Sequence, residues 1–205
     1  MKKNKISKNW IRKQSKDPFF RQAKIEGYRS RSAYKLIEIN NKFSFIKKNS
    51  LLLDLGSSPG GWSQAANKII NSGKILSIDI KKMDKINNVF FLQEDLNDPE
   101  IYNKIYSYFN KKIDVVISDI AANTSGNKNL DSFKTGELCM ASMNLAIQIL
   151  KENGVFLSKF FMGSIFSEIN KKAKTHFEQV VNFKPKSSKK ESREIYLFCK
   201  NILKN

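Results

Sequence analysis

Two apolar segments far apart in the chain each run into a turn with the composition of a ligand-binding loop. The first, LLLDLGSSPGGW at residues 51–62, combines a strand with a glycine-rich turn that opens a helix. The second, VVISD at residues 115–119, is another apolar strand and ends in a carboxylate. In an open α/β sheet, ligands bind at the carboxyl ends of the strands. We therefore expect both turns to face one crevice, with a cofactor on the first and the chemistry near the second.

Strand and helix patterns alternate from residue 51 onward, after an early helix. The spacing predicts helices at residues 31–41, 60–71, 99–109, 134–151 and 163–176. It predicts strands at residues 51–55, 74–79, 89–93, 113–118, 154–160 and 193–200, with a weaker strand near 178–183. Runs such as Val115-Val116-Ile117 are typical of strands buried on both faces. The expected fold is a single α/β, Rossmann-like domain with a mostly parallel seven-stranded sheet flanked by helices.

The positive charge of the chain is concentrated near the N-terminus. The 205 residues include 37 Lys or Arg and 19 Asp or Glu, a net charge of +18. Residues 1–31 hold eleven of these cations and two acids, which makes +9, half of the total. Such an excess favours RNA, DNA or an anionic membrane as a partner. We divide the chain into a basic RNA-binding arm, residues 1–30, and an α/β domain, residues 31–205.

Two other classes are disfavoured by the sequence. We find no apolar run long enough to span a bilayer, and the basic N-terminus lacks the apolar stretch of a signal peptide. We therefore expect no membrane segment. The residues that commonly ligate metals lack partners at ligand spacing, so we also expect no metal site: Cys139, Cys199 and His176.

Acidic residues follow the first strands of the predicted sheet. Gly60 and Gly61 let the backbone approach a ligand closely, because side chains there would block it. Asp79 ends the second strand at about the distance expected for a ribose-binding carboxylate, and Asp95 follows the third. The turn is not G-x-G-x-x-G, and acids at three strand ends suit a cationic sulfonium better than a pyrophosphate. The residues favour S-adenosylmethionine as cofactor, with a nucleotide-dependent oxidoreductase as the alternative.

A lysine lies where burial is costly. Lys159 sits within VFLSKFF at residues 155–161, and a buried ammonium needs a partner. With Asp119, at the end of the fourth strand, it forms a second candidate cluster. Glu194 opens the last strand and Lys35 lies on the early helix, but spacing alone links neither to this site.

Four segments together carry a specific family resemblance. They are GYRSRSAYKL at residues 27–36, DLGSSPGGWSQ at 54–64, SDIA at 118–121 and SREIY at 192–196. In these segments the chain resembles the FtsJ-type (RrmJ or RlmE) ribosomal RNA 2′-O-methyltransferases, and the match runs from about Trp10 to Cys199. One position departs from the family: Ala122 stands where the family usually has proline, which loosens that loop.

The resemblance implies roles for individual residues. The family uses a Lys-Asp-Lys-Glu tetrad, which corresponds here to Lys35, Asp119, Lys159 and Glu194. Its cofactor contacts correspond to Gly60, Trp62, Asp79, Asp95 and Asp119. The reaction implied is in-line methyl transfer from S-adenosylmethionine to a ribose 2′-hydroxyl.

Lys159 is the candidate for removing the hydroxyl proton. Burial and the nearby Lys35 favour its neutral form, which could act as a base, whereas Asp119 and Glu194 favour the charged form. A charged Lys159 would instead stabilise the developing alkoxide. Both roles are compatible with the sequence.

The resemblance also implies a substrate, a uridine of large-subunit (23S) ribosomal RNA in the assembled subunit. DNA lacks the 2′-hydroxyl and is not expected as a substrate. The alternatives are tRNA, an mRNA cap, or a non-catalytic RNA-binding ribosome assembly factor. We expect the protein to be cytoplasmic and monomeric.

Overall fold

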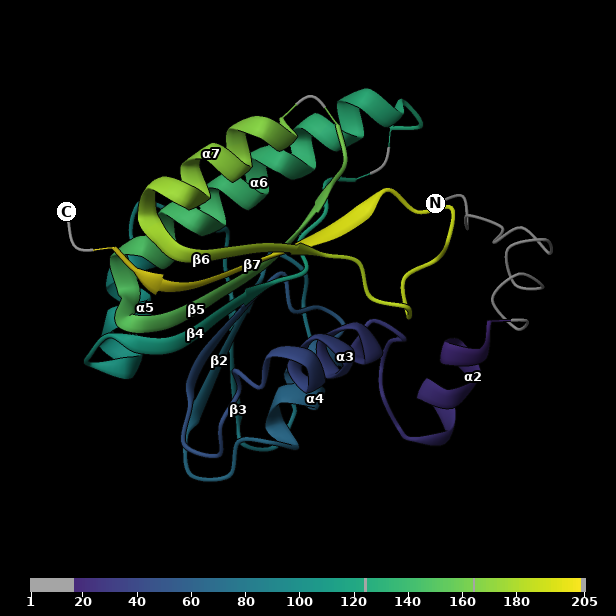
Figure 1. Ribbon diagram of the computed structural model, residues 1–205. Coiled ribbons are helices and arrows are strands. Elements are labelled where there is room, and N and C mark those ends of the chain that lie inside the picture. The colour runs from purple at the N-terminus through teal and green to yellow at the C-terminus, as the bar shows by residue number, and fades with distance from the viewer. Residues whose placement is uncertain (1–16, 124, 164, 204–205) are drawn as a thin grey trace, which may run out of the picture.

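Seven strands form one sheet in the order β3-β2-β1-β4-β5-β7-β6 in a computed structural model, which describes residues 17–123, 125–163 and 165–203 (Figure 1). The strands are β1 (Leu51–Leu55), β2 (Lys74–Asp79), β3 (Val89–Gln93), β4 (Ile113–Ser118), β5 (Leu150–Phe161), β6 (Phe177–Phe183) and β7 (Glu194–Ile202). The helices are α2 (Pro18–Ile25), α3 (Ala33–Phe43), α4 (Gly61–Asn67), α5 (Ile101–Phe109), α6 (Lys128–Ile149) and α7 (Phe166–His176).

The sheet is mostly parallel, as predicted. Strands β1 to β5 pair in parallel, whereas β7 runs antiparallel to both β5 and β6. The order in which the strands are added changes direction at β1. Strands β2 and β3 lie on one side of β1, and the chain then returns to place β4 on its other side. Ligands bind at such a switch point, outside the carboxyl ends of the strands.

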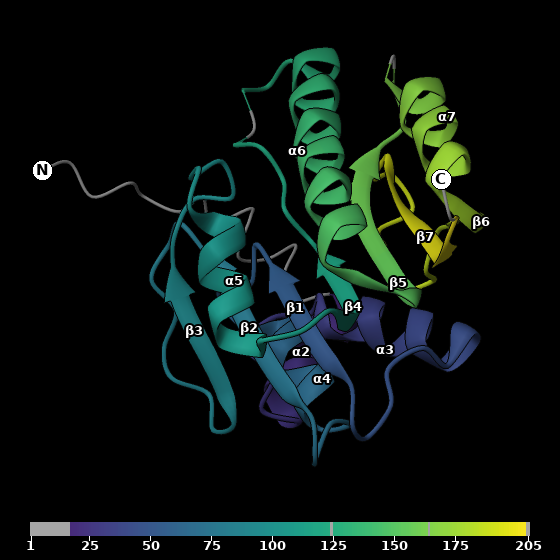
Figure 2. The same cartoon turned by 90° about the vertical axis from the view of Figure 1, so that its left-hand side faces the viewer.

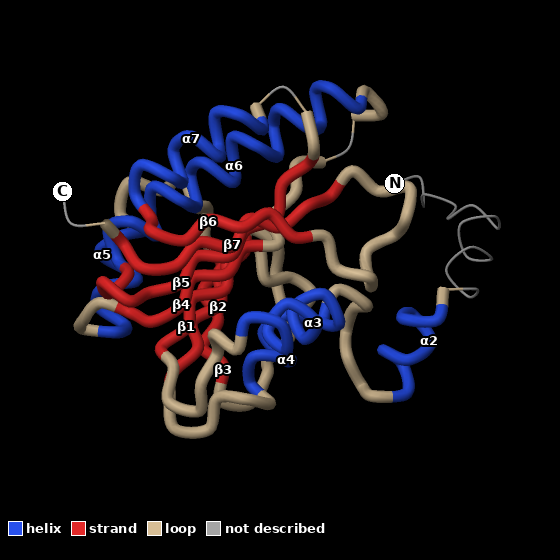
Figure 3. The backbone as a smooth tube through the Cα atoms, in the orientation of Figure 1, coloured by secondary structure: helices blue, strands red, loops and turns tan. Residues whose placement is uncertain are grey.

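Helices cover both faces of the sheet. Figures 1 and 2 show α6 and α7 on one side, with α3 and α4 on the other, and Figure 3 shows the sheet as the layer between them. Strand β1 alternates between these layers. Leu53 and Leu55 pack in the core beneath α5 and α6, while Leu52 packs with α3 and α4. Burial on both faces explains why every residue of this strand except Asp54 is apolar.

Two helix ends differ most from the sequence prediction. Helix α6 begins at Lys128 rather than at residue 134, because the side chain of Asn127 accepts hydrogen bonds from the Asn129 and Leu130 N–H groups at 3.1 and 3.2 Å. Helix α4 ends at Asn67 rather than at residue 71. The N–H groups of Asn71, the last residue of the predicted helix, and of Ser72 after it instead donate to the Lys48 carbonyl at 3.0 Å.

The remaining differences are small shifts of boundaries. Strand β5 begins at Leu150, where the pattern predicts helix, and its register against β4 is irregular between Ile113 and Val115. Helix α7 begins at Phe166 rather than at residue 163, and α3 spans Ala33–Phe43 rather than 31–41. Helix ends depend on caps and local bonds that periodicity does not contain.

Helix α2 lies in the segment that the sequence assigns to the basic arm, and no helix is predicted there. Asp17 caps it, with its side chain accepting from the Phe19 N–H at 3.0 Å, and Pro18 occupies the first turn. Phe19 contacts Tyr34 of α3, with ring centroids 5.6 Å apart. Residues 17–25 therefore contact the α/β domain, whereas residues 1–16 of the arm lie outside the described residues. Within the described ranges, no helix is long and apolar enough to cross a membrane.

Candidate active site

Two lysine–carboxylate pairs lie at the carboxyl ends of β4 and β5. Lys159 Nζ is 2.8 Å from Asp119 Oδ1 and donates to the Asp119 carbonyl at 2.6 Å. Lys35 Nζ donates to Glu194 Oε2 at 2.8 Å. Lys159 and Glu194 are each 8% exposed, so both pairs are largely removed from water. The structure thus brings together all four residues of the predicted tetrad.

Sheet register explains how such distant residues meet. Strands β5 and β7 are antiparallel, with Lys159 opposite Tyr196 and Phe161 opposite Glu194. Residues two apart share a face of a strand, so Lys159, Glu194 and Tyr196 point to the same side. That side is covered by α3, which supplies Lys35.

Tyr196 joins the two pairs and is a site residue that the sequence prediction missed. Its hydroxyl donates to Asp119 Oδ1 at 3.1 Å, and its ring lies 5.8 Å from Lys35 Nζ. Burial, then the nearby carboxylates of Asp119 and Glu194, raise the pKa of Tyr196 well above its ordinary value, so it remains a donor. Its place two residues after Glu194 in a strand was the available signal.

Asp119 remains ionised in this setting. Burial alone would raise the pKa of its carboxyl. The positive charges of Lys159 and Lys35, with hydrogen bonds from Lys159 and Tyr196, outweigh burial and lower the pKa below its ordinary value. The site therefore holds a fixed negative charge against two lysines.

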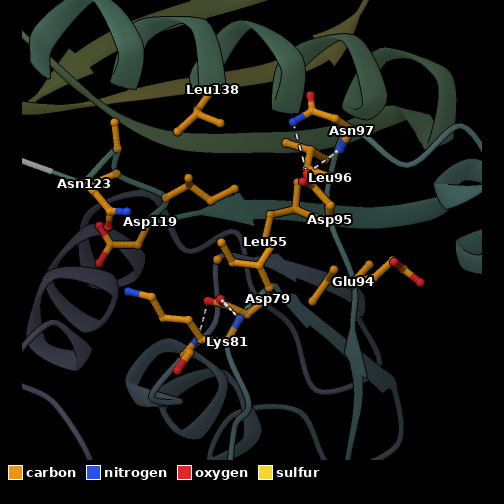
Figure 4. A pocket seen from close by; sticks show the side chains of 17 residues that line it. Leu55, Asp79, Lys81, Glu94, Asp95, Leu96, Asn97, Asp119, Asn123 and Leu138 are labelled. Carbon is orange, nitrogen blue, oxygen red and sulfur yellow. Dashed lines mark hydrogen bonds between the residues drawn. The ribbon is translucent and has the colours of Figure 1, made fainter. Parts of the chain in front are cut away.

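A cavity of about 340 Å³ opens beside Asp119, at the ends of β1, β2 and β4. Figure 4 shows Asp79, Asp95 and Asp119 around it, with Leu138 of α6 on its far side. Three of the predicted cofactor residues thus line one cavity. Asp119 also belongs to the tetrad, so the cavity and the tetrad have this residue in common.

The glycine-rich turn after β1 forms part of the cavity wall. Gly56 has a φ of +73°, and a Cβ there would lie 2.3 Å from Ile120 Cγ1, so the turn requires glycine. The Gly56 N–H donates to the Ile78 carbonyl at 2.8 Å. Asp79 fixes the turn two residues further on, where its Oδ2 accepts from the Ser58 N–H at 2.9 Å. The predicted ribose-binding carboxylate therefore also fixes the loop.

Arg29 connects this turn to the loop after β2. Its guanidinium donates to the carbonyls of Pro59, Asp84 and Lys85 at 3.3, 2.6 and 2.8 Å. Its backbone N–H donates to the Gln64 side chain at 2.8 Å. Arg29 is thus a second residue that the sequence prediction missed, and the fork of donors on arginine suits this bridging contact.

Gly60 and Trp62, predicted as cofactor contacts, do not line the cavity. Gly60 caps α4 with a φ of +114°, and a Cβ there would approach Ile86 to 2.8 Å. Trp62 is buried; its Nε1–H donates to the Ser32 carbonyl at 2.9 Å, and its ring lies 5.7 Å from that of Tyr196. In this structure Trp62 packs against Tyr196, beside the tetrad, and does not face the cavity.

Asp54, on β1 beneath the glycine turn, is a fully buried carboxyl. Its Oδ2 accepts from Ser63 Oγ at 2.6 Å, while its Oδ1 has no hydrogen-bond partner. Burial, followed by the charges of Asp119 and Asp79, raises the pKa of Asp54 to about 7. The surroundings of Asp54 thus favour the protonated, uncharged form of its carboxyl.

The predicted non-ligands occupy structural positions. Cys139 and Cys199 are buried free thiols, and burial raises the pKa of Cys139 to about 12. His176 ends α7, where its Nδ1 lies 2.9 Å from the Lys172 carbonyl. Among the described residues, no cluster of three or more His, Cys, Asp or Glu is arranged to hold a metal ion.

Comparisons with known proteins agree on one family. The model of the FtsJ-like methyltransferase family matches residues 28–202. A Pelagibacter ubique protein named Ribosomal RNA large subunit methyltransferase E is 50% identical over 200 residues, covering 98% of each chain.

Solved structures share the fold of this chain. A crystal structure of a Plasmodium falciparum protein described as a ribosomal RNA methyltransferase is 37% identical, with a TM-score of 0.78. The match covers 87% of this chain and all of that one. A Streptococcus mutans protein described as a methyltransferase, in complex with SAH, shares the fold at a TM-score of 0.54 and 14% identity. That match covers 80% of this chain and 96% of the other.

The raised pKa of Asp54 predicts a pH-dependent cost to stability. The contribution of the protonated carboxyl to the free energy of unfolding is fully present below the unfolded pKa of about 3.9 and is lost as pH rises from there through the folded pKa of about 7. Asp54→Asn keeps the side chain neutral. The variant should exceed the wild type in free energy of unfolding by roughly 1–4 kcal/mol at pH 8, and much less at pH 5.

Urea unfolding of both proteins at the two pH values measures this difference. Asp84→Asn, at an exposed acid, is the control and should show no such pH trend. A difference between Asp54→Asn and the wild type that is equal at pH 5 and pH 8 would contradict the prediction.

Proposed function

The chain belongs to the FtsJ-like methyltransferase family, and we propose that it methylates a ribose 2′-hydroxyl of large-subunit ribosomal RNA with S-adenosylmethionine as donor. The observation that carries this proposal is the meeting of Lys159 and Asp119 at 2.8 Å, beside Lys35 and Glu194, with Asp119 also lining a cavity. A chain that held only RNA would not require this arrangement of buried ion pairs next to a small-molecule cavity.

The cavity suits S-adenosylmethionine in size and in chemistry. Small-molecule sites usually measure about 300–1,000 Å³, and this one is about 340 Å³. Asp79 and Asp95 offer carboxylate oxygens for ribose hydroxyls, and Asp119 adds negative charge opposite a sulfonium. The bound group supplies a methyl on a positively charged sulfur, already activated for transfer. The SAH complex of a protein with the same fold supports this assignment.

Lys159 is assigned to the reacting hydroxyl. An ammonium has three N–H donors, and Asp119 accepts two of them through Oδ1 and its carbonyl. The third can reach a substrate oxygen and stabilise the negative charge that develops there. Alternatively, a neutral Lys159 takes the hydroxyl proton as a general base. Both contacts with Asp119 hold Nζ in place, and the base role requires an ammonium to lose its proton before transfer.

Lys35 and Glu194 are assigned to positioning and electrostatics. Glu194 holds Lys35 Nζ above the Tyr196 ring, and the charge of Lys35 helps to lower the pKa of Asp119. An ionised Asp119 in turn fixes Lys159. Loss of Glu194, Lys35 or Asp119 should thus change the position or the electrostatic surroundings of Lys159, the residue assigned to the reacting hydroxyl.

The substrate is proposed to be a uridine of 23S ribosomal RNA in the assembled large subunit. The name of the Pelagibacter relative and the net charge of +18 support a ribosomal RNA substrate. We further propose that the protein acts as a monomer in the cytoplasm and does not modify DNA. Mapping 2′-O-methyl groups on ribosomal RNA from cells with and without the protein tests the proposal. Methylation of tRNA or capped RNA, with no change in ribosomal RNA, would replace it with the alternative substrates.

Asp79→Ala is expected to weaken S-adenosylmethionine binding by roughly 1–3 kcal/mol, the scale of a lost hydrogen bond to a charged group. The variant also loses the contact that fixes the Ser58 N–H. Calorimetry on the purified protein measures the affinity. Asp84→Ala removes an equal charge from the following loop, outside the cavity lining, and should bind normally. Unchanged affinity in Asp79→Ala would remove this residue from the site.

Lys159→Ala should abolish methyl transfer while the fold and cofactor affinity remain. Lys159→Arg should fail too, because guanidinium does not act as a base and differs in shape. Single-turnover assays with labelled cofactor give the rate, and Lys200→Ala, an exposed lysine on β7, is the control. If Lys159 acts as a base, the wild-type rate should rise with pH. Near-wild-type turnover in Lys159→Ala would refute its catalytic role.

The basic arm is expected to contact RNA phosphates. Deleting residues 1–16 removes seven cations at positions 2, 3, 5, 8, 12, 13 and 16 and leaves Lys35 and the cavity in place. The truncated protein should keep its cofactor affinity, bind RNA more weakly, and show a shallower dependence of affinity on salt. Replacing the same seven residues by serine in the full chain separates charge from length. Identical salt slopes for all three proteins would mean that the arm does not contact RNA.

A further inference from the structure

The loop between β6 and β7 leads directly into the tetrad. Its residues 184–193 include one acid, Glu191, and end immediately before Glu194. They also carry five cations: Lys184, Lys186, Lys189, Lys190 and Arg193. On the proposed function, on which this inference rests, such a loop contacts phosphates of the RNA that enters the site.

An acid on α3 holds the start of this loop. Glu38 Oε1 accepts from the Lys186 N–H at 2.7 Å, and Glu38 Oε2 accepts from the N–H and the hydroxyl of Ser187, both at 3.0 Å. Both carboxylate oxygens are therefore used on two consecutive residues of the loop. Hydrogen bonds to a charged acceptor are stronger than neutral ones.

Further contacts restrain the same turn. Arg31 donates to the Ser187 carbonyl and pairs with Asp17 at the start of α2. The Ser188 N–H donates to the Pro185 carbonyl at 3.0 Å, which closes the turn. Ser187 is 1% exposed, although its neighbours Lys189 and Lys190 are exposed. The loop is thus anchored at the buried Ser187 and Ser188, beside the exposed Lys186, Lys189 and Lys190, whereas Lys184 Nζ donates back to the carbonyls of Lys190 and Ser192 at 3.3 and 2.6 Å.

We propose that Glu38 is a positioning residue that holds the 184–193 loop in the conformation that binds RNA. Glu38 follows Lys35 by one turn of α3, so a single helix orients both the tetrad and this loop. A loop that is ordered before binding loses less conformational entropy when it meets its ligand. This gain in RNA affinity must exceed the loss caused by repulsion between the Glu38 carboxylate and the RNA phosphates.

Charge and position make opposite predictions for loss of this acid. If charge alone mattered, Glu38→Ala would bind RNA more tightly, because the protein becomes more positive. If Glu38 positions the loop, Glu38→Ala should bind RNA more weakly, by about tenfold, because the loop must be ordered on binding. Glu191→Ala makes the same change in charge within the loop, at an exposed acid. It should bind RNA as tightly as the wild type or more tightly.

The experiment compares these two variants and Ser187→Ala, which removes one of the three bonds to Glu38 without changing charge. Fluorescence anisotropy with a labelled single-stranded RNA oligonucleotide gives the affinity, at two salt concentrations. Amide hydrogen exchange on the free proteins measures order in residues 185–193. Glu38→Ala should exchange faster there and bind more weakly, and Ser187→Ala should do so by a smaller factor. Cofactor affinity, which should be unchanged in every variant, reports on folding.

Two results would overturn the inference. One is RNA affinity of Glu38→Ala equal to or above that of Glu191→Ala, and the other is unchanged exchange in the loop. If Glu38→Ala fails to fold, the charge-neutral Ser187→Ala decides, and wild-type RNA affinity in it would also overturn the inference. Absence of RNA binding by the unaltered chain would count against the proposed substrate instead. These outcomes separate the position of Glu38 from the function of the protein.

Discussion

The ion pair between Lys159 and Asp119 is the contact on which the rest of the site depends. A lysine that is 8% exposed is costly to bury, and losing one partner of such a pair would leave an uncompensated charge. The pair exists because β4 and β5 are parallel neighbours, so their carboxyl ends lie side by side. Tyr196 and Lys35 then complete the hydrogen bonding and the charge around Asp119. The order of strands thus determines the chemistry, because no local sequence pattern could place these groups together.

The segment from Arg29 to Glu38 organises the loops around this pair. Arg29 joins the glycine turn to the loop after β2, and Lys35 enters the tetrad. Arg31 and Glu38 hold the loop before β7. These side chains come from the start of one helix and the turn before it, yet they contact parts of the chain on both sides of the site. One short segment therefore relates the position of the cavity beside Asp119 to that of the basic loop.

Hydrophobic pattern and strand-end chemistry were sufficient to predict the sheet and part of the site. Burial on both faces makes β1 and β4 largely apolar, and their bounds were predicted to the residue. Asp79 and Asp119 were identifiable because carboxyl ends of parallel strands share one edge. The helix starts were harder, since the cap at Asn127 depends on a side-chain bond. Lys35 and Glu194 could be assigned only through the family resemblance, because their 2.8 Å contact spans 159 residues of sequence. Arg29 and Glu38 act through geometry that no spacing rule encodes, whereas the place of Tyr196 two residues after Glu194 in one strand offered a signal.

The distribution of charge separates two ligands of opposite sign. The chain carries +18 overall, yet acids dominate the cavity wall, with Asp79, Glu94, Asp95 and Asp119 against one lysine, Lys81. Lys104 offsets Glu94 from outside the lining. A cavity of this sign attracts a cation such as a sulfonium and repels phosphates, whereas the basic loop before β7 does the reverse. The tetrad lies where these two regions meet, with two lysines and two carboxylates in balance. A methyl donor and an RNA backbone could therefore approach the same atoms from different sides without competing for one surface.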